Sequence, residues 1–567
     1  MGDWYEKQTL GLLPERAAGH WGASEALACR GERWTFAELH AGVDAAAKGL
    51  LELGIAPGDR VALWMVNRPE WLHAMFAVMQ IGAVLVPVNT RFRTDDMGYV
   101  LGQSDAVAVI LGDRSGPVDY LGMMREVAPG LGTRRDARFP ALRHVIAVSD
   151  EAHASTIGWH RMLEDGRRVA DEALRARARA VDPRDAAFVF YTSGTTGFPK
   201  GAVHDHRIVQ NTWDMANRMG VTADDVILMY LPLFHAFGFI CGALMSMITG
   251  ARQVLTEAFD AHACVDLIAS ERATMIHGFD THFKDLLVAQ AKAPRNVSSV
   301  RTGICGTGVS SAIPIARQAR RTFGRFMTGF GMSEVGIATL SDLDSTEEQC
   351  VEANGYPLPG CEVRVIDPAT GRDQPISVPG EILARSYMVT EGYYKKPEET
   401  AQALDKDGWF HTGDMGLMRP DGHLRFLGRY KDMLKIGGEN VDPMEVEGFL
   451  MSHPAIRMAA VVGVPDARLS EVTVAFVQVE PGSTLSERDV IDHCRGRVAS
   501  FKTPPPCGLR RRVPHDQHRE DPEGEAPRAR SPRLARPDPV IAKGPLPARN
   551  GAAAATAAGG PSWAATM

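Results

Sequence analysis

A run of glycine, serine and threonine, YTSGTTGFPKG at residues 191–201, is the strongest chemical signal in this sequence. It directly follows the apolar segment AAFVF, so we expect a buried strand that leads into a polar loop. The glycines permit backbone conformations closed to other residues, hydroxyl and amide groups can donate to phosphate oxygens, and Lys200 adds a positive charge. No Gly-Lys-Ser/Thr follows Gly194 at the Walker A spacing, which excludes a kinase-like P-loop. A plain polar hairpin turn is the alternative to a polyphosphate-binding loop.

Four more segments carry side chains that could catalyse or bind. MYLPLFHAFG contains His235, GFGMSE contains Glu334, WFHTGDMG contains Asp414, and GRYKDMLKIGGENVDPMEVE contains Arg429 and a glycine pair. Taken alone, each has an ordinary structural explanation, such as a packed histidine in an apolar loop, a surface glutamate, a turn aspartate or a β-turn. Together with the loop and GYYKKPEET, however, they resemble in type and order the motifs of the adenylate-forming superfamily. That superfamily includes acyl-CoA synthetases, firefly luciferases and the adenylation domains of peptide synthetases.

The resemblance covers about residues 20–503 and implies a carboxylic acid, ATP, Mg²⁺ and CoA as the reacting partners. A carboxylate is a poor electrophile, so attack on the α-phosphate of ATP first converts it into an acyl-adenylate, from which a thiol then displaces AMP. The resemblance assigns catalysis to His235, Glu334 and Lys200, and binding of Mg²⁺ to Thr196 and Glu334. The implied ATP-binding set is Thr192, Ser193, Gly194, Thr195, Thr196, Gly197, Lys200, Gly306, Thr307, Phe330, Gly331, Ser333, Asp414 and Arg429.

Phe330 and Ser333 depart mildly from the family pattern, which usually has tyrosine and threonine at these positions. The resemblance gives Phe330 a stacking role on adenine, and Asp414 with Arg429 a role in holding the ribose hydroxyls. For the second half-reaction it implies rotation of a small C-terminal domain about Lys431. The implied CoA-binding residues are Lys435, Gly437, Gly438 and Glu439, because glycines suit a narrow passage past backbone.

The end of the chain breaks this pattern. FKTP at residues 501–504 matches the start of the last family motif, but the Gly-Lys expected about twenty residues later is missing. The only later lysine, Lys543, lies too far along the chain to be assigned that role. From Pro504 onward the sequence is rich in proline and arginine and loses its periodicity, so we expect disorder and hypothesise a replaced or frame-shifted C-terminus that impairs adenylation.

Alternating helical and strand-like segments must position these residues. TFAELHAGVDAAAKGLLELG predicts an amphipathic helix, and PGDRVALWM, AVLVPV, AVAVIL, RHVIAVS and AAFVF predict strands separated by helices. We therefore expect an α/β fold with a large N-terminal adenylate-forming domain, containing parallel sheets, helices and a small β-rich subdomain from near Gly355. A small mobile α+β C-terminal domain follows. The predicted boundaries are 1–428, 429–503 and an atypical tail at 504–567.

Composition excludes several other classes of protein. The chain has 567 residues, 45% of them hydrophobic and 23% charged, with a net charge of -7. This is typical of a soluble globular protein of at least two domains, and no basic patch suggests nucleic acid as a partner. The eight cysteines are scattered without metal-ligand spacing, and no export signal or membrane-spanning segment is evident, so we expect a cytoplasmic protein. A homodimer is a possible assembly.

The sequence defines the carboxylic acid substrate less clearly than it defines the reaction. HGFDTHFKDLL at residues 277–287 should border the acyl pocket, and its polar residues Asp280 and His282 make this wall unlike that of a simple fatty-acid site. A medium-chain fatty acid is the first expectation, and an aromatic or cyclic acid is the alternative. An enzyme that loads a carrier protein and an adenylation-defective protein that only binds nucleotide and CoA are the competing functions.

Overall fold

The computed structural model describes residues 8–130, 136–192, 199–307, 312–430, 434–436, 439–441, 443–466, 470–480, 482–495 and 497–498. Several predicted site residues lie outside these ranges: Ser193, Gly194, Thr195, Thr196, Gly197, Lys431, Gly437 and Gly438. The predicted tail at 504–567 also lies outside them. The proposed domain boundaries therefore stay predictions.

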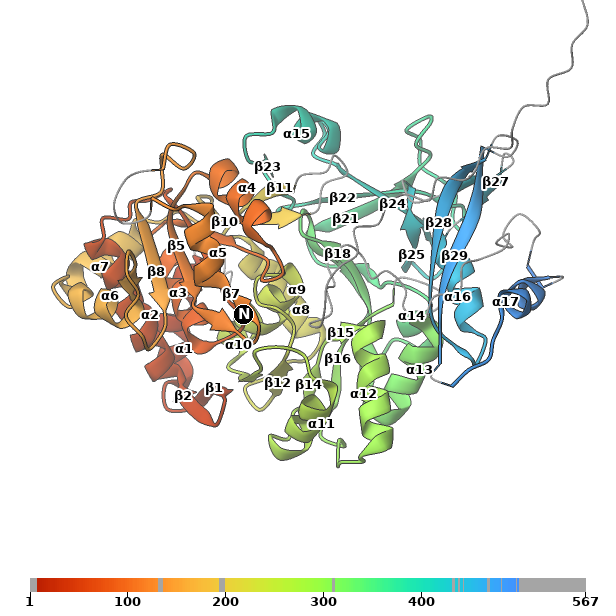
Figure 1. Ribbon diagram of the computed structural model, residues 1–567, viewed down its shortest axis with the longest axis horizontal. Helices are drawn as coiled ribbons and strands as arrows, with labels where there is room; N and C mark the ends of the chain where they lie inside the picture. Colours follow the sequence, from red (N-terminus) through yellow and green to blue (C-terminus); the bar gives the residue numbers. More distant parts are fainter. Residues whose placement is uncertain are drawn as a thin grey trace, which may run out of the picture. The chain divides into compact units, whose positions relative to one another are not determined.

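Two eight-stranded sheets form the large N-terminal part (Figure 1). The first has the order β15-β16-β14-β12-β13-β1-β2 with β17 beside β16, and only its β1–β2 edge is antiparallel. Its strands are Gly278–Phe279 (β15), Thr302–Gly306 (β16), Met275–Ile276 (β14), Val226–Met229 (β12), Arg252–Leu255 (β13), Glu25–Cys29 (β1), Glu32–Thr35 (β2) and Arg325–Met327 (β17).

The second sheet has the order β23-β11-β10-β4-β3-β5-β8-β9 and is parallel from β10 to β9. The β10–β11 hairpin and β23 add antiparallel strands at one edge. Its strands are Gly392–Tyr393 (β23), Lys200–Asp205 (β11), Ala186–Thr192 (β10), Val84–Pro87 (β4), Arg60–Trp64 (β3), Ala106–Gly112 (β5), His144–Val148 (β8) and Ile157–Gly158 (β9).

Helices connect and cover these sheets. They are Leu10–Leu12 (η2), Leu13–Trp21 (α1), Phe36–Glu52 (α2), Pro69–Gln80 (α3), Thr94–Ser104 (α4), Tyr120–Val127 (α5), Trp159–Gly166 (α6), Asp171–Arg179 (α7), Ile208–Arg218 (α8), Ala236–Gly238 (α9), the π-helix Phe239–Leu244 (η3), Met245–Thr249 (α10), Ala261–Ser270 (α11), Asp280–Lys292 (α12) and Ala312–Thr322 (α13). One hydrophobic core contains residues from both sheets together with α2, α3 and η3. Aromatic contacts of Phe239 with Trp71 at 6.4 Å and with Phe188 at 5.0 Å join η3 to α3 and β10 in that core.

Helix α2 shows how local sequence sets these elements. The Thr35 hydroxyl accepts from the Glu38 backbone N–H at 3.2 Å, and the Glu38 carboxylate accepts from the Thr35 N–H at 2.8 Å. This reciprocal cap satisfies donors that the first helical turn leaves unpaired. The helix ends before Gly54, whose φ of 74° suits glycine. The predicted helix and its predicted end are confirmed.

Smaller sheets complete the described structure. Strands Gly329–Met332 (β18), Gly336–Leu340 (β19) and Tyr356–Pro357 (β20) form one, and Cys361–Ile366 (β21), Gly380–Ser386 (β22), Phe410–Met418 (β24) and Leu424–Arg429 (β25) form the β-rich subdomain expected after Gly355. A two-stranded ribbon (β6, Arg114–Ser115; β7, Val118–Asp119) and helices α14 (Glu347–Val351) and α15 (Pro397–Ala403) lie in the loops. The C-terminal part contains β26 (Leu434–Ile436), β27 (Glu439–Val441), α16 (Pro443–Met451), β28 (Ile456–Asp466), β29 (Ser470–Val479) and α17 (Glu487–Cys494).

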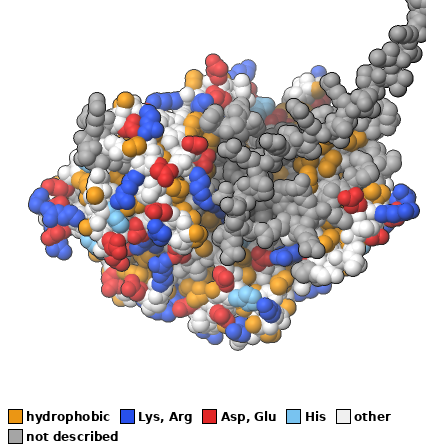
Figure 2. Space-filling model, viewed as in Figure 1, with side chains coloured by type: hydrophobic (Ala, Val, Ile, Leu, Met, Phe, Trp, Pro, Cys, Tyr) orange, Lys and Arg blue, Asp and Glu red, His pale blue; other side chains and the backbone are white. Residues whose placement is uncertain are grey.

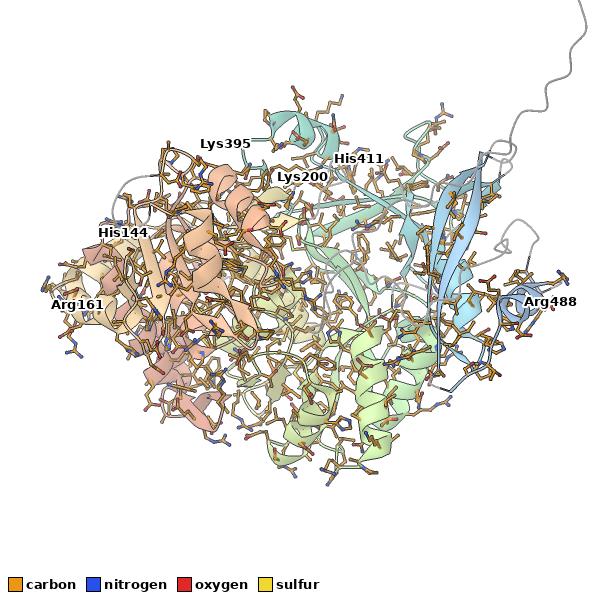
Figure 3. The ribbon with its side chains drawn as sticks, viewed as in Figure 1. His144, Arg161, Lys200, Lys395, His411 and Arg488 are labelled. Atoms are coloured by element: carbon orange, nitrogen blue, oxygen red, sulfur yellow. The ribbon has the colours of Figure 1, made fainter. Side chains whose placement is uncertain are left out.

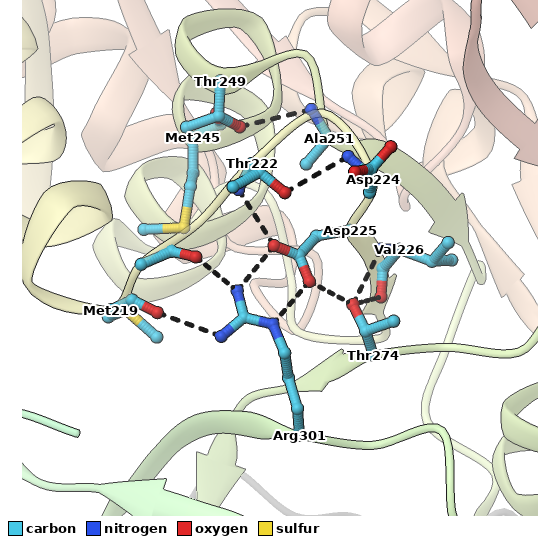
Figure 4. Close-up of polar contacts among 11 residues, drawn as sticks. Met219, Thr222, Asp224, Asp225, Val226, Met245, Thr249, Ala251, Thr274 and Arg301 are labelled. Atoms are coloured by element: carbon cyan, nitrogen blue, oxygen red, sulfur yellow. Dashed lines mark hydrogen bonds and ion pairs between the residues drawn. The ribbon is translucent and has the colours of Figure 1, made fainter. Parts of the chain in front are cut away.

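A charged cluster fixes the start of the first sheet's central strands (Figure 4). The Arg301 guanidinium, just before β16, donates Nε–H to Asp225 Oδ1 at 2.7 Å and Nη2–H to Oδ2 at 2.5 Å. The Thr274 hydroxyl donates to the same carboxylate at 2.7 Å. Burial opposes ionisation of Asp225, but these hydrogen bonds outweigh it and lower its pKa. The cluster therefore ties β12, β14 and β16 together at their amino ends.

The surface and the cysteines agree with an ordinary globular protein. On the face drawn in Figure 2, Lys and Arg side chains alternate with Asp and Glu over the part of the chain that is described. The seven cysteines with described positions are all buried and free. Among the described residues, the helices are each too short or too polar to cross a membrane.

Candidate active site

Glu334 lies in the tight turn between β18 and β19, where Gly336 adopts a φ of 63°. Its side chain is buried, with 5% of the residue exposed. One carboxylate oxygen, Oε1, accepts hydrogen bonds from the Thr192 hydroxyl at 3.0 Å and from the Tyr393 hydroxyl at 3.1 Å. The turn, the end of β10 and strand β23 thus converge on one buried carboxylate.

Lys200 lies opposite Thr192 in the β10–β11 hairpin, so strand pairing holds the two ends of the predicted phosphate loop side by side. Figure 3 labels Lys200 among the side chains. Its ammonium nitrogen lies 4.8 Å from the centre of the Tyr393 ring. Burial and the Glu334 carboxylate raise the pKa of Tyr393, so its hydroxyl stays protonated and donates to Glu334. Tyr393 therefore positions a predicted cation with its ring and a predicted metal ligand with its hydroxyl.

The surroundings of Glu334 suit a Mg²⁺ ion that is held mainly by the phosphates of a bound nucleotide. Mg²⁺ is usually held by one or two carboxylates together with substrate phosphates and water, rather than by a closed set of protein ligands. Among the described residues no group of three or more His, Cys, Asp or Glu side chains could hold a metal by itself. A single buried carboxylate, fixed through one oxygen by two hydroxyls, fits the open type of site.

Asp414 and Arg429 face each other across the β24–β25 pair, and their ribose-binding role stays a prediction. Arg429 Nε lies 3.1 Å from Asp414 Oδ1, and the Asp414 residue is only 4% exposed. The Arg429 side chain is 44% exposed. The buried acid is thus oriented by a guanidinium that stays accessible to a ligand.

The remaining predicted nucleotide residues line the ends of β16 and β18. Gly306 packs against the Phe279 ring so closely that a Cβ atom would lie 2.8 Å from it. The Thr307 hydroxyl bonds to that of Thr328 at 2.8 Å, and its carbonyl accepts from the Asn354 side chain. Phe330 is 6% exposed and stacks on Phe426 at 6.0 Å, so its contact with adenine stays a prediction. Gly331 is exposed and Ser333 is half-buried.

His235 begins the short helix α9, which follows the end of β12. Its Nδ1 accepts the Phe237 backbone N–H at 3.2 Å, which assigns the proton of the neutral ring to Nε2. Burial lowers the pKa of His235, although its surface is exposed to solvent. The exposed His235 side chain lies in the wall predicted for the acid-binding region.

Aromatic side chains continue this wall toward residues 277–287. The Phe237 ring lies 5.4 Å from Phe279, which is 44% exposed, and 6.0 Å from His277. Burial raises the pKa of Asp280 at the start of α12. The predicted acyl-pocket border is therefore mainly aromatic, with histidine and aspartate beside it.

The predicted CoA-binding segment is only partly described. Lys435 and Glu439 lie on β26 and β27, which pair as a hairpin with Lys435 opposite Asn440 and Ile436 opposite Glu439. Their CoA contacts and the Lys431 hinge stay predictions. The contacts of Tyr393 with Glu334 and Lys200 were not predicted, although Tyr393 stands in the motif GYYKKPEET. The signal available was an aromatic residue in a matched motif to which no role had been assigned.

Comparison with known proteins gives the same family. The chain matches the AMP-binding enzyme family over residues 14–394 and the C-terminal domain of AMP-binding enzymes over residues 445–518. The second match continues beyond Pro504, where the sequence pattern becomes irregular. The first match includes Thr192, Lys200, Glu334 and Tyr393 of the site described above.

Individual relatives are CoA ligases. A Mycobacterium tuberculosis ligase, named for a propanoyl chain on a methyl-dioxo-octahydro-indene ring system, is 36% identical over 482 residues, covering 84% of this chain and 90% of the relative. The mouse mitochondrial medium-chain acyl-CoA ligase ACSF2 is 30% identical over 511 residues, covering 88% of this chain and 83% of the relative. A crystal structure of an anthranilate CoA ligase with anthranoyl-AMP has the same fold, with a TM-score of 0.78, 23% identity and coverage of 90% and 95%. The chain belongs to the AMP-binding family of adenylate-forming enzymes and is of the acyl-CoA ligase type.

Proposed function

We propose that this protein joins a carboxylic acid to CoA by way of an acyl-adenylate, with release of pyrophosphate and then AMP. The observation that carries the proposal is the convergence of Thr192 and Tyr393 on the buried Glu334 carboxylate, with Lys200 over the ring of the same Tyr393. A buried carboxylate is costly unless it is hydrogen-bonded or binds a cation. Mg²⁺ bound there would supply positive charge to the nucleotide phosphates.

The surrounding residues supply the rest of the first half-reaction. Lys200, held over the Tyr393 ring, offers a positive charge at the end of the phosphate loop, and such preorganised charge is commonly the largest contribution to catalysis. Asp414 and Arg429 orient the ribose, and the Nε2–H of neutral His235 is available to a carboxylate oxygen beside Phe237. These groups hold ATP and the carboxylic acid in position and do not themselves react.

Free CoA is the acceptor that we propose for the second half-reaction. The family type and the hairpin that carries Lys435 and Glu439 support this assignment. A carrier protein is the rival acceptor, but the described chain contains no separate carrier domain and the sequence shows no carrier-attachment motif. Free CoA and a carrier thiol offered separately with ATP and acid distinguish the two.

For the acid we propose a medium-chain fatty acid or an acid of similar size. The medium-chain relative and the aromatic wall of Phe237 and Phe279 support an apolar acyl group of this size. A cyclic or aromatic acid is the second candidate, favoured by the ring-bearing acid in the name of the M. tuberculosis ligase. We also propose that the protein works in the cytoplasm, which the buried free cysteines support, and that it can form a homodimer.

The test is a panel of linear, cyclic and aromatic acids with ATP, Mg²⁺ and CoA, scored for AMP and for acyl-CoA by mass spectrometry. Glu334→Gln keeps the shape of the side chain and both hydroxyl contacts but removes the charge. We expect it to lower pyrophosphate release by roughly 10²- to 10³-fold with an unchanged melting temperature. AMP formation that needs neither acid nor CoA, or a fully active Glu334→Gln variant, contradicts the proposed function.

A further inference from the structure

His277 directly follows strand β14, between the two segments that we propose border the acid. Strand β14 lies between β12, which leads to His235, and β16, which leads to Gly306. All three strands are parallel, so their carboxyl ends meet at one edge of the sheet, the usual location of ligands in such folds. The chain therefore places the His277 side chain beside the proposed acid-binding region.

The hydrogen bonds of His277 are incomplete. The Ile304 backbone N–H donates to Nδ1 at 3.2 Å, which assigns the ring proton to Nε2. The residue is 1% exposed, and Nε2 has no partner among the described residues. Burial lowers the pKa of His277 to about 3, so the ring is neutral at physiological pH and offers one fixed N–H donor.

The surroundings of this donor are those of the proposed acyl wall. The His277 ring meets the Phe237 ring edge-on, with centroids 6.0 Å apart, and Phe237 lies two residues after His235. Met275 and Thr302 are register partners on β14 and β16, and His277 comes two residues after Met275. A buried donor without a partner is unfavourable, so this position is suited to a bound acceptor.

We propose that His277 is a specificity-determining residue that donates its Nε2–H to an oxygen carried by the acyl part of the acid. This rests on the proposed function and narrows it: the favoured substrate is an oxo- or hydroxy-substituted acid, linear or cyclic, rather than an unsubstituted one. Binding such an acid gives the buried N–H its missing partner. An unsubstituted acid of the same size would leave the His277 Nε2–H without a hydrogen-bond acceptor.

The test compares matched pairs, each consisting of an oxo or hydroxy acid and its deoxy analogue. For the unmodified protein we expect kcat/KM to favour one or more of the oxygenated acids by about 10- to 100-fold. His277→Leu removes the donor and should collapse that preference toward unity, while His277→Gln, which keeps a donor, should restore part of it. Equal use of both acids of every pair, as expected if a buried water satisfies Nε2, overturns the proposal. So does a His277→Leu variant that loses activity equally toward both.

Tyr230 provides a matched control. It directly follows β12, is 2% exposed, and its hydroxyl also has no partner among the described residues, but it packs against Phe259 and His282 instead of Phe237. Tyr230→Phe should leave the preference unchanged, whereas an equal collapse in this variant would assign the effect to packing and contradict the role of His277. If ATP-dependent turnover is slow, synthetic acyl-adenylates of the same pairs are offered with CoA. Activity confined to deoxy acids overturns this inference alone, while the absence of any acyl-CoA product from acids or adenylates overturns the proposed function.

Discussion

The hydroxyl of Tyr393 donates to Oε1 of Glu334 at 3.1 Å, while the ring of the same tyrosine lies 4.8 Å from the Lys200 ammonium nitrogen. One side chain thus sets the position of both charged groups that the adenylation step is expected to use. The two contacts use different parts of Tyr393, so substitution can separate them. The hydroxyl can be removed while the ring stays.

Tyr393→Phe should weaken the use of Mg²⁺ more than it weakens binding of the acid. Loss of the hydroxyl leaves Glu334 with one fewer donor, and loss of a group that orients a metal ligand typically costs about 10- to 100-fold in metal affinity or activity. The measurement is pyrophosphate release as a function of Mg²⁺ concentration. Tyr394→Phe is the matched control, because the Tyr394 hydroxyl donates to Asp105 at 2.9 Å instead. Similar losses in both variants would contradict the assigned role.

Asp414→Asn should impair recognition of the ribose. A hydrogen bond to a charged group contributes about 1.5–3 kcal/mol, so we expect the KM for ATP to rise by about tenfold or more. The discrimination between ATP and 2′-deoxy-ATP should also shrink, because the carboxylate is the expected partner of the ribose hydroxyls. Asp421→Asn, in the turn at the far end of the same hairpin, is the control. Undiminished discrimination in Asp414→Asn would assign the pair a purely structural role.

Asp225→Asn should lower the free energy of unfolding without a direct effect on the site. The substitution breaks a two-point contact between the Asp225 carboxylate, whose side chain is 5% exposed, and the Arg301 guanidinium, whose side chain is 34% exposed. We expect the free energy of unfolding to fall by about 1–3 kcal/mol. Denaturant unfolding with matched activity assays at neutral pH measures the effect. A variant as stable as the unmodified protein would show that the pair adds nothing beyond its neighbours.

The contact between Asp225 and Arg301 should also make the free energy of unfolding depend on pH, with a sign that follows from the pKa shift of Asp225. The folded protein lowers the pKa of Asp225, so the unfolded chain binds the proton more readily. The stabilisation is therefore complete above the unfolded-state pKa of about 3.9 and is lost as the pH falls through the lower folded-state value. The stability difference between the unmodified protein and Asp225→Asn should be constant from about pH 7 to pH 5 and shrink below about pH 4. A difference that grows on acidification would reverse this sign.

The two half-reactions should be unequally affected by the atypical end of the chain. The family lysine expected shortly after FKTP is missing, so adenylation should run roughly 10²- to 10³-fold more slowly than in a chain whose tail restores Gly-Lys there. Acyl-CoA formation from a supplied acyl-adenylate should suffer less. Measuring both rates in the two proteins tests this. Equal adenylation rates would show that another group replaces the lysine.

Features set by neighbouring residues could be predicted from the sequence. The Thr35 cap and the end of α2 before Gly54 depend on positions close along the chain, and the predicted helix and its end at Gly54 are confirmed. The apolar segment after Val226 folds as a buried strand, a loop and core helices, and its periodicity did not indicate the π-helix at Phe239–Leu244. That segment depends on packing against α3 and β10, which are distant in the sequence.

Contacts between segments that are far apart in the sequence could not be predicted from neighbouring residues. The facing positions of Asp414 and Arg429 agree with the roles that the resemblance implies. The link from Tyr393 to Glu334 joins residues 59 positions apart, and nothing in either motif specifies it. Likewise, the stacking of Phe330 on Phe426 depends on the packing between two separate sheets. Side-chain partners of this kind follow from the tertiary fold rather than from residue type.

Arg429 is the last residue of β25, and the predicted hinge lies two positions further along the chain. The guanidinium that contacts Asp414 is therefore anchored at the point where the chain leaves the β-rich sheet. A nucleotide bound to Asp414 and Arg429 would therefore contact the same short stretch of backbone whose torsion angles would set the direction of the following segment. Binding at the predicted ribose site and rotation about the predicted hinge would then be coupled through neighbouring residues, without any long-range relay.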